Sequence, residues 1–89
     1  MEGLEGFELA PYFERWVLDN PERRHLLPHI AGTVNEPEEI AYQEDGKLRH
    51  YKYVEWVGHH VRVTTTADGA LFDAHEDSNY TRKKRRQNS

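Results

Sequence analysis

The 89-residue sequence contains no cysteine, which excludes disulfide bonds and thiolate metal sites. Apolar residues make up 36% of the chain and its mean hydropathy is −0.99, so the hydrophobic core must be small. No apolar run approaches the roughly 20 residues that a membrane helix requires, and the acidic start of the chain is unlike a signal peptide. These absences predict one small domain in the cytoplasm, with no membrane partner.

Basic residues are scarce in the first eighty positions. Residues 1–80 hold seven Lys and Arg against sixteen Asp and Glu, a net charge of −9, whereas residues 82–86 add five positive charges. An acidic body does not attract nucleic acid as a whole, so such a contact must use a local basic face or the C-terminal tail. The tail could hold phosphate or bind an acidic partner; the alternative is a solubilising, disordered end.

Apolar spacing predicts two helices in the first half of the chain. From residue 8, apolar side chains recur every three or four positions and define one helical face: Leu9, Tyr12, Phe13, Trp16 and Val17. Asn20-Pro21 begins a second helix, because Asn is a favoured N-cap and Pro suits the first helical position. Pro28 lies inside that second helix and is expected to kink or split it.

The second half of the chain predicts four strands, over residues 40–43, 48–53, 60–66 and 70–75. Two Asp-Gly pairs are hairpin signals, and Gly58-His59 fits a type II′ turn between the middle strands. The expected fold is α+β, with two N-terminal helices packed on a four-stranded antiparallel meander sheet, in one domain over residues 7–77. Residues 78–89 form a basic tail, whose lack of apolar residues from position 81 onward predicts disorder.

The hairpin turns fix which residues lie opposite each other in the sheet. The last turn places Arg62 opposite His75, and the middle turn places Glu55 opposite Arg62. These three side chains then form a row on one sheet face, because directly opposed residues lie about 4.5–5.5 Å apart at Cβ. In the alternative, a turn at Val57-Gly58 shifts the register and separates Glu55 from Arg62.

The other face of the predicted sheet collects the apolar residues on which the helices are expected to pack: Val54, Trp56, Val61, Val63, Phe72 and Ala74. The second strand fits this pattern less well. It places Arg49 and Tyr51 on the polar face but His50 and Lys52 on the apolar one. We therefore expect a bulge or a strand end near Lys52.

A carboxylate, a guanidinium and an imidazole in one row are the groups needed to cleave RNA without a metal. The reaction needs a base for the 2′-hydroxyl proton, a cation for the charged phosphorane and an acid for the leaving 5′-oxygen. Glu55, Arg62 and His75 fit these roles in that order. Stacking, hydroxyl and basic groups would add contacts to RNA: Arg49, Tyr51, Tyr53, Thr64, Arg82 and Lys83. The competing interpretation is a solvated face with a cross-strand ion pair.

His25 and His29 have the i, i+4 spacing that lets two imidazoles share a metal ion. Pro28 disturbs that turn and no third ligand is evident, so surface histidines are the favoured interpretation. We therefore expect neither a metal nor a cofactor.

Short motifs of the chain resemble those of small toxin-type nuclease domains. They are Ile30-x-x-Thr33-Val34-x-x-Pro37-x-x-Ile40, Val61-Arg62-Val63 and Leu71-Phe72-Asp73-Ala74. The resemblance covers residues 16–75 and points to the phage and prophage members of the superfamily that unites barnase, EndoU, the tRNase colicins and RelE. It implies helices before a four-stranded antiparallel sheet whose open face cleaves RNA without a metal, and it carries over one residue, Arg62, directly.

The leading hypothesis is a metal-independent endoribonuclease of toxin type that cleaves RNA by 2′-hydroxyl transesterification. RNA is then the substrate, DNA is not expected, and a cognate inhibitor or another protein is the partner. The rival hypothesis is a non-catalytic protein-binding module that keeps a nuclease-like fold. The acidic body, unlike the basic surface typical of such toxins, favours the rival, whereas the polar row favours the enzyme.

Overall fold

Three prolines mark the starts of three short helical elements in the N-terminal half. α1 (Pro11–Asp19) is followed by the 3₁₀-helix η1 (Pro21–Leu26) and then by α2 (Leu27–Asn35), each with a proline in its first turn. A proline is tolerated there because its missing N–H would have no helical partner in any case. Pro28 therefore splits the predicted second helix, as the sequence indicates.

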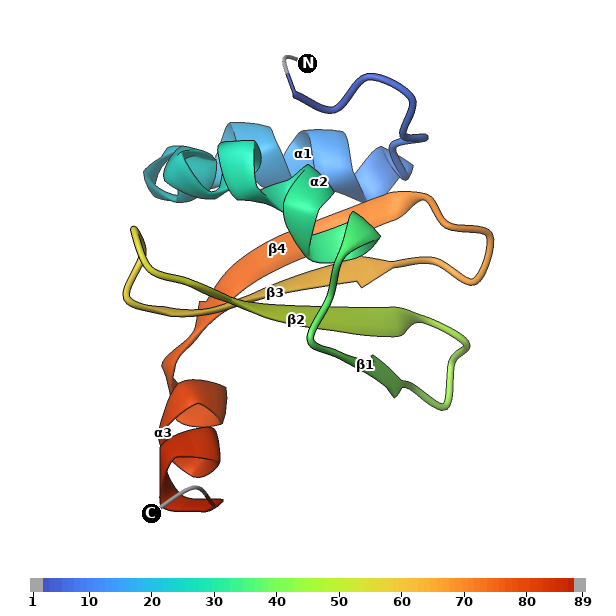
Figure 1. Ribbon diagram of the computed structural model, residues 1–89. Coiled ribbons are helices and arrows are strands. Elements are labelled where there is room, and N and C mark those ends of the chain that lie inside the picture. Colours follow the sequence, from blue (N-terminus) through green and yellow to red (C-terminus); the bar gives the residue numbers. More distant parts are fainter. Residues whose placement is uncertain (1–2, 88–89) are drawn as a thin grey trace.

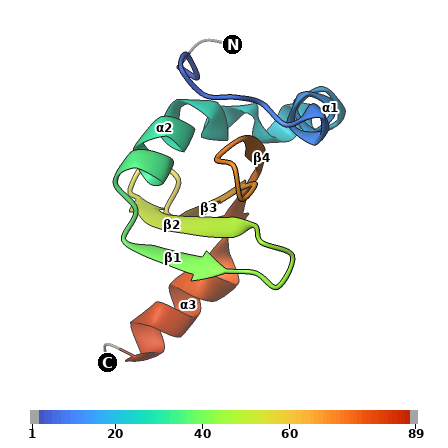
Figure 2. The ribbon, with the colours of Figure 1, turned by 90° about the vertical axis from the view of Figure 1, so that its right-hand side faces the viewer.

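The computed structural model describes residues 3–87 and confirms the α+β fold with a four-stranded antiparallel meander (Figure 1). The strands β1 (Glu39–Tyr42), β2 (Leu48–Val54), β3 (His59–Thr65) and β4 (Leu71–Asp77) are hydrogen-bonded in the order β1-β2-β3-β4. α1 and α2 lie on one side of this sheet, and α3 (Ser78–Gln87) lies on the other (Figures 1 and 2).

The core lies between the N-terminal helices and the sheet. Its buried members come from both layers and, in the case of Leu4, from the segment before α1: Leu4, Phe13, Trp16, Val17, Leu26, Ile30, Val61, Val63, Leu71 and Ala74. Alternation along β3 directs Val61 and Val63 toward the helices and leaves Arg62 on the opposite face. Among the described residues, the sheet face turned away from α1 and α2 is therefore the polar one.

The hairpin between β3 and β4 has the predicted register, with Arg62 opposite His75. Its turn differs from the predicted two-residue loop, because Thr66 N–H donates to Ala70 O at 2.8 Å and leaves three residues in the loop. A β-bulge directly after Thr64 offsets the additional residue. The predicted pairing of Arg62 with His75 is thus correct, because the longer loop and the bulge shift the register by one residue in opposite directions.

The predicted register between β2 and β3 is wrong. Val54 pairs with His59, so the loop between these strands has four residues, and Tyr51 lies opposite Arg62 in the place predicted for Glu55. The alternative turn at Val57-Gly58 does not occur either. Because the shift amounts to an even number of residues, each side chain of β2 keeps its predicted face while its cross-strand partner changes.

The four-residue loop between β2 and β3 changes which side chains are buried at this end of the sheet. Trp56, expected beneath the helices, lies in the loop and is 88% exposed. Of the two features expected near Lys52, β2 has no bulge but ends two residues later at Val54, and His50 is buried on the helical side. His50 Nδ1 lies 3.0 Å from Val63 O, to which its N–H donates, so burial leaves this nitrogen paired.

The expectation of a disordered tail is wrong over residues 78–87, which form α3. Asp77 Oδ1 accepts the Tyr80 N–H at 2.9 Å, a hydrogen bond of the N-cap type. The Tyr80 ring stacks on Tyr51 with 4.0 Å between ring centroids, and Thr81 is buried. Residues 88 and 89 of the tail lie outside the described residues.

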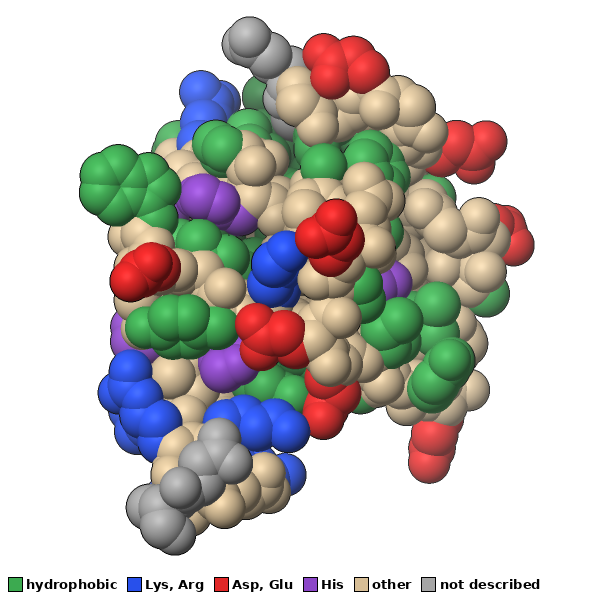
Figure 3. Space-filling model, in the orientation of Figure 1, with side chains coloured by type: hydrophobic (Ala, Val, Ile, Leu, Met, Phe, Trp, Pro, Cys, Tyr) green, Lys and Arg blue, Asp and Glu red, His purple; other side chains and the backbone are tan. Residues whose placement is uncertain are grey.

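Charge is divided between the sheet domain and α3. Lys and Arg side chains gather over α3, whereas Asp and Glu side chains are scattered over the remainder of the face in view (Figure 3). Within residues 3–87, no helix has both the length and the apolar character needed to cross a membrane.

Candidate functional site

The predicted row of Glu55, Arg62 and His75 is not assembled. Glu55 lies exposed in the loop between β2 and β3, beyond the last paired residue of β2. Arg62 and His75 are cross-strand neighbours, as predicted. The Arg62 guanidinium pairs with a different carboxylate, Asp77, with 3.3 Å between Nη1 and Oδ2. The carboxylate beside Arg62 therefore belongs to the end of β4.

His75 is held by contacts on both of its ring nitrogens. Arg23 of η1 contacts Nδ1, and Asp73 Oδ2 lies 3.3 Å from Nε2. Because arginine only donates hydrogen bonds, Nδ1 must accept and Nε2 must carry the proton that faces Asp73. The ring also meets Trp16 edge-on, with 6.1 Å between centroids. In this arrangement His75 joins β4 to the helices and has no ring N–H directed at a substrate.

The Asp73 carboxylate is ionised more readily than an ordinary aspartate. Burial raises its pKa, but the hydrogen bonds from His75 and Thr64, together with the positive charge of Arg62, outweigh burial and hold the pKa below its usual value. This carboxylate is therefore a stable acceptor for the His75 N–H.

The aromatic and hydroxyl residues predicted to bind RNA differ in their exposure to solvent. Tyr51 is 6% exposed and is covered by Tyr80 of α3, so its ring is not open to a base. Thr64 is buried, and Arg49 lies opposite it in the sheet. Tyr53 is 38% exposed and lines a pocket. Of these predicted contacts, Tyr53 is the one best placed to meet a ligand.

The basic residues predicted to bind RNA lie on α3. Arg82 and Lys83 are exposed and line a shallow hollow formed by α3 alone, with Asn79, Arg86 and Gln87. Arg82 donates a hydrogen bond to Asn79. Neither residue lines the pocket to which Tyr53 belongs.

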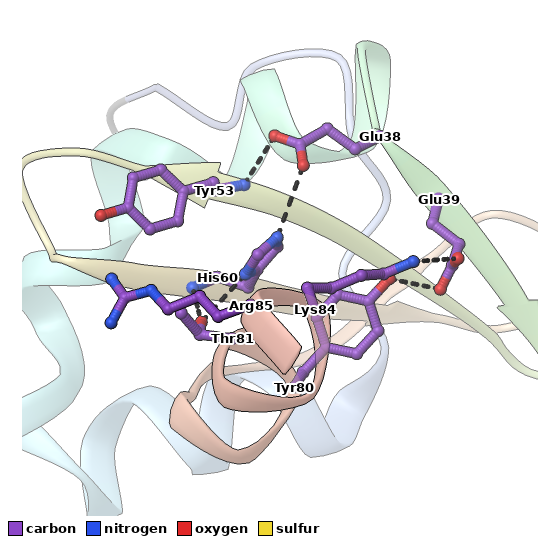
Figure 4. Close-up of a pocket in the computed structure, with 8 residues that line it drawn as sticks. All are labelled: Glu38, Glu39, Tyr53, His60, Tyr80, Thr81, Lys84 and Arg85. Atoms are coloured by element: carbon purple, nitrogen blue, oxygen red, sulfur yellow. Dashed lines mark hydrogen bonds and ion pairs between the residues drawn. The ribbon is translucent and has the colours of Figure 1, made fainter. Parts of the chain in front are cut away.

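A pocket of about 340 Å³ lies where α3 meets the polar sheet face (Figure 4). The start of β1, the facing ends of β2 and β3, and one side of α3 contribute its lining: Glu38, Glu39, Tyr53, His60, Tyr80, Thr81, Lys84 and Arg85. Two carboxylates, an imidazole, two phenols and two cations thus converge on one cavity. Such a convergence of titratable groups is typical of binding and catalytic sites.

His60 is the central side chain of this pocket. Its Nε2 lies 3.4 Å from Glu38 Oε1, and its Nδ1 lies 2.9 Å from Thr81 Oγ1 (Figure 4). Glu38 is oriented in turn by Tyr53, whose backbone N–H donates to Glu38 Oε2 at 2.9 Å. A carboxylate and a hydroxyl oxygen can both accept hydrogen bonds, so this geometry accommodates the protonated imidazole that a general acid requires.

Thr81 positions His60 and does not act as a nucleophile. The Thr81 hydroxyl accepts the His60 backbone N–H at 2.7 Å and lies 3.2 Å from Asp77 O. The residue is 3% exposed, so its oxygen is closed to a substrate. A Glu-His-Thr relay for acyl transfer is therefore excluded by burial.

Glu39 and Tyr80 close the other side of the pocket. Tyr80 O–H donates to Glu39, and Lys84 Nζ lies 3.1 Å from Glu39 Oε1. The hydrogen bonds from Tyr80 and Lys84 lower the pKa of Glu39. Burial and the Glu39 carboxylate raise the pKa of Tyr80 far above its usual value, so its phenol stays neutral. Tyr80 is thereby a fixed donor that attaches α3 to β1.

Of the two histidines with metal-ligand spacing, His25 has other partners. His25 Nδ1 lies 3.0 Å from Glu22 O, and His25 Nε2 lies 2.5 Å from Glu76 Oε1. Across residues 3–87, no three His, Asp or Glu side chains are grouped so that they could hold a metal ion.

Most residues of the pocket were missed in the sequence because α3 was not predicted. Asp77 followed by a polar turn is a usable N-cap signal, and Tyr80 and Lys84 have the i, i+4 spacing of one helical face. Tyr80 and Lys84 were predicted only as part of a basic, disordered tail, and Asp77 only as the last residue of the domain. No family model matches this chain, and neither does a curated protein or a solved structure.

Proposed function

We propose that this chain is a metal-independent endoribonuclease of toxin type, acting in the cytoplasm, whose active site is the pocket around Glu38 and His60. The supporting observation is that one cavity brings a carboxylate, an imidazole and two cations together beside an exposed aromatic ring. These are the groups that RNA cleavage without a metal requires. They differ from the predicted row, since the register places Glu55 elsewhere.

Each group has one role in this proposal. Glu38, whose second oxygen is fixed by the Tyr53 N–H, removes the proton of the 2′-hydroxyl. The hydroxyl oxygen attacks phosphorus, and the charge that develops on the phosphorane is stabilised by Lys84 and Arg85, both of which line the cavity. His60 donates a proton to the departing 5′-oxygen, and a 2′,3′-cyclic phosphate remains on the other fragment.

Glu38 and His60 contact each other in the structure, and the phosphodiester would enter between them. The 52% exposure of the Glu38 side chain permits this movement, whereas His60 is 9% exposed and anchored through Thr81. Catalytic hydrogen bonds commonly reach their final geometry only when substrate is bound. Tyr53 would stack on a base next to the cleaved bond.

The first experiment is an RNA cleavage assay in EDTA that detects 2′,3′-cyclic phosphate ends. We expect wild-type cleavage, with Glu38→Gln and His60→Gln each lowering kcat/KM by about 10²- to 10⁴-fold, the usual contribution of one acid or base. In Glu38→Gln the new amide oxygen can still accept the Tyr53 N–H, so that substitution removes the base while preserving the local structure.

A matched control is available on the same chain. Glu36→Gln alters an exposed group outside the pocket and is expected to leave cleavage unchanged. Because His60 is buried, each variant should also be compared with wild type by thermal unfolding. Full activity of folded Glu38→Gln would remove the proposed base.

A protein-binding module without catalysis is the second candidate, and the charge distribution favours it. The net charge of −9 over residues 1–80 opposes RNA binding, and within the pocket Lys84 is already paired with Glu39. Folded wild-type protein that cleaves none of several RNAs would support this candidate. Expression in a host separates the two cheaply, because an active toxin arrests growth in the absence of its inhibitor.

A further inference from the structure

Trp56 exposes the largest apolar ring of the described chain to solvent. It is 88% exposed, whereas the other tryptophan, Trp16, is 3% exposed. The loop that carries Trp56 is not loose: the N–H groups of Val57 and Gly58 donate to Val54 O at 3.0 and 2.9 Å. Gly58 adopts a φ of +82°, which only glycine adopts readily. The loop backbone thus holds the ring outward.

Beside this ring lies a hollow of about 420 Å³. Its lining comes from the loop and from the start of the helical layer: His25, Pro28, His29, Trp56 and Val57. An aromatic face, a proline face and two imidazoles can stack on a base and hydrogen-bond to it. The hollow is separate from the Glu38–His60 pocket and shares no lining residue with it.

The apolar surface here suits a single base better than a protein. A stable protein interface buries about 800 Å² on each partner. The other large exposed apolar residues apart from Tyr53 lie on different elements, Tyr12 and Leu18 on α1, and Ile40 and Tyr42 on β1. Tyr42 pairs with Leu48, at the opposite end of β2 from the loop. Trp56 is therefore an isolated ring and does not belong to an extended apolar face.

The hollow and the pocket proposed to be catalytic are lined by residues that are close together in the sequence. Tyr53 lines that pocket and precedes Trp56 by three residues, so their Cα atoms lie at most about 11 Å apart. The same loop leads directly into His60 through His59. The hollow lies on the helical side of the sheet and the pocket on the side of α3, so a strand that reaches both must pass around the loop between β2 and β3.

We infer that the Trp56 hollow is a base-stacking subsite for single-stranded RNA. It holds a nucleotide flanking the phosphodiester that lies in the Glu38–His60 pocket. The inference rests on the proposed function and adds to it a substrate class, since a base paired in a duplex cannot be stacked on an external ring without being unpaired.

The test uses the full chain and 2′-O-methyl oligouridylate, which lacks the attacking hydroxyl and so binds without being cleaved. We expect a nine-nucleotide probe to quench the emission of Trp56. Trp56→Ala is expected to raise the Kd about 5- to 150-fold, the loss typical of removing one stacking ring. Leu18→Ala, which removes an exposed apolar side chain of α1, is the control and should not change the Kd.

The outcomes separate this subsite from the proposed function. If Trp56→Ala binds the probe as wild type does and RNA is still cleaved, the subsite is overturned and the ribonuclease stands. If wild type neither binds nor cleaves RNA, both are overturned. If affinity for RNA is unchanged but Trp56→Ala abolishes self-association in sedimentation, the ring is a protein contact. An equal Kd for double-stranded RNA would overturn the preference for single strands.

Discussion

At the scale of single residues, His75 and His60 have neighbours that give them different chemistry. His75 has an arginine on one ring nitrogen and an aspartate on the other, which fixes one neutral tautomer. His60 has oxygen acceptors on both nitrogens and lines a cavity. The same residue type is therefore a structural contact in one place and a proposed acid in the other.

The depressed pKa of Asp73 predicts a specific dependence of stability on pH. A carboxylate with a lowered folded-state pKa stabilises the fold above its unfolded pKa, and this stabilisation is lost as pH falls through the folded value. Asp73→Asn should therefore lower the free energy of unfolding by about 1 kcal/mol near neutral pH, a charged hydrogen bond discounted for partial exposure. The difference should shrink as pH falls below about 4, the ordinary range of an aspartate, as measured by urea unfolding.

The control for this experiment is Asp68→Asn, in the exposed turn between β3 and β4. Glu39 and Asp45 also have lowered pKa values, and their contributions are common to wild type and variant, so the difference isolates Asp73. A constant difference between wild type and Asp73→Asn across this range would contradict the assigned role of Asp73.

The sequence could show that Arg62 and His75 are neighbours, but not what each contacts. Their pairing follows from a local turn, and local turns are read from a few residues. The contact between His75 and Arg23 joins positions 52 residues apart and depends on how η1 packs on β4. No short pattern encodes that packing, so the loss of His75 as a proposed acid became visible only in the structure.

At the scale of secondary structure, α3 exists because four contacts offset its charge. Five cations lie within this ten-residue helix, and their mutual repulsion opposes it. The Asp77 cap, the Tyr51–Tyr80 stack, the buried Thr81 and the pair between Lys84 and Glu39 hold the helix on the sheet. Three of its cations lie in the last turn, where they complement the helix dipole.

The cap of α3 offers a matched pair of substitutions. Asp77→Ala removes the acceptor of the Tyr80 N–H and should lower the free energy of unfolding by about 1–2 kcal/mol, with loss of helical circular dichroism. Asp77→Asn keeps a capping oxygen and loses only the charge that faces Arg62. It should therefore lie close to wild type in urea unfolding. Equal stability of the Ala and Asn variants would show that the cap contributes nothing.

The hairpins show which part of a sheet a sequence can specify. The two N-terminal helical segments and the order of the strands followed from apolar spacing, prolines and Asp-Gly turns and were confirmed in outline. The Asn20 side chain, however, makes no capping hydrogen bond at the start of η1 and donates to Trp16 O instead. Glycine with positive φ fits both a two-residue and a four-residue loop, so Gly58 could not decide the length of the loop. Apolar patterning favoured burial of Trp56 over His50, and the structure has the reverse.

At the scale of the whole molecule, the proposed site lies at the boundary between opposite charges. The sheet and N-terminal helices form an acidic body, and α3 brings its cations against that body beside the pocket (Figure 3). Long-range attraction of RNA is weak under this distribution, because the negative charge of the body repels the same phosphates that the cations of α3 attract. Binding must then depend on the few cations that reach the bound phosphates.

This charge distribution predicts a shallow salt dependence of RNA binding. The logarithm of the association constant falls with the logarithm of salt concentration by about 0.7 for each phosphate neutralised on a single strand. Contacts from Lys84 and Arg85, the two cations of the pocket, give a slope of about −1.4. Lys84→Gln should reduce the slope to about −0.7, whereas Arg82→Gln, on the other side of α3, should not change it. Titration of uncleavable 2′-O-methyl oligouridylate at several salt concentrations measures each slope.

The size of the slope distinguishes two ways in which this protein could bind RNA. If all five cations of α3 follow the backbone, the slope should approach about −3.5, and the pocket would not be the centre of binding. A slope near zero would mean that no phosphate is neutralised and would favour the protein-binding candidate. The third outcome is a slope of about −1.4 that Lys84→Gln reduces and Arg82→Gln leaves unchanged. The phosphodiester then lies in the pocket beside Glu38 and His60, where the proposed chemistry requires it.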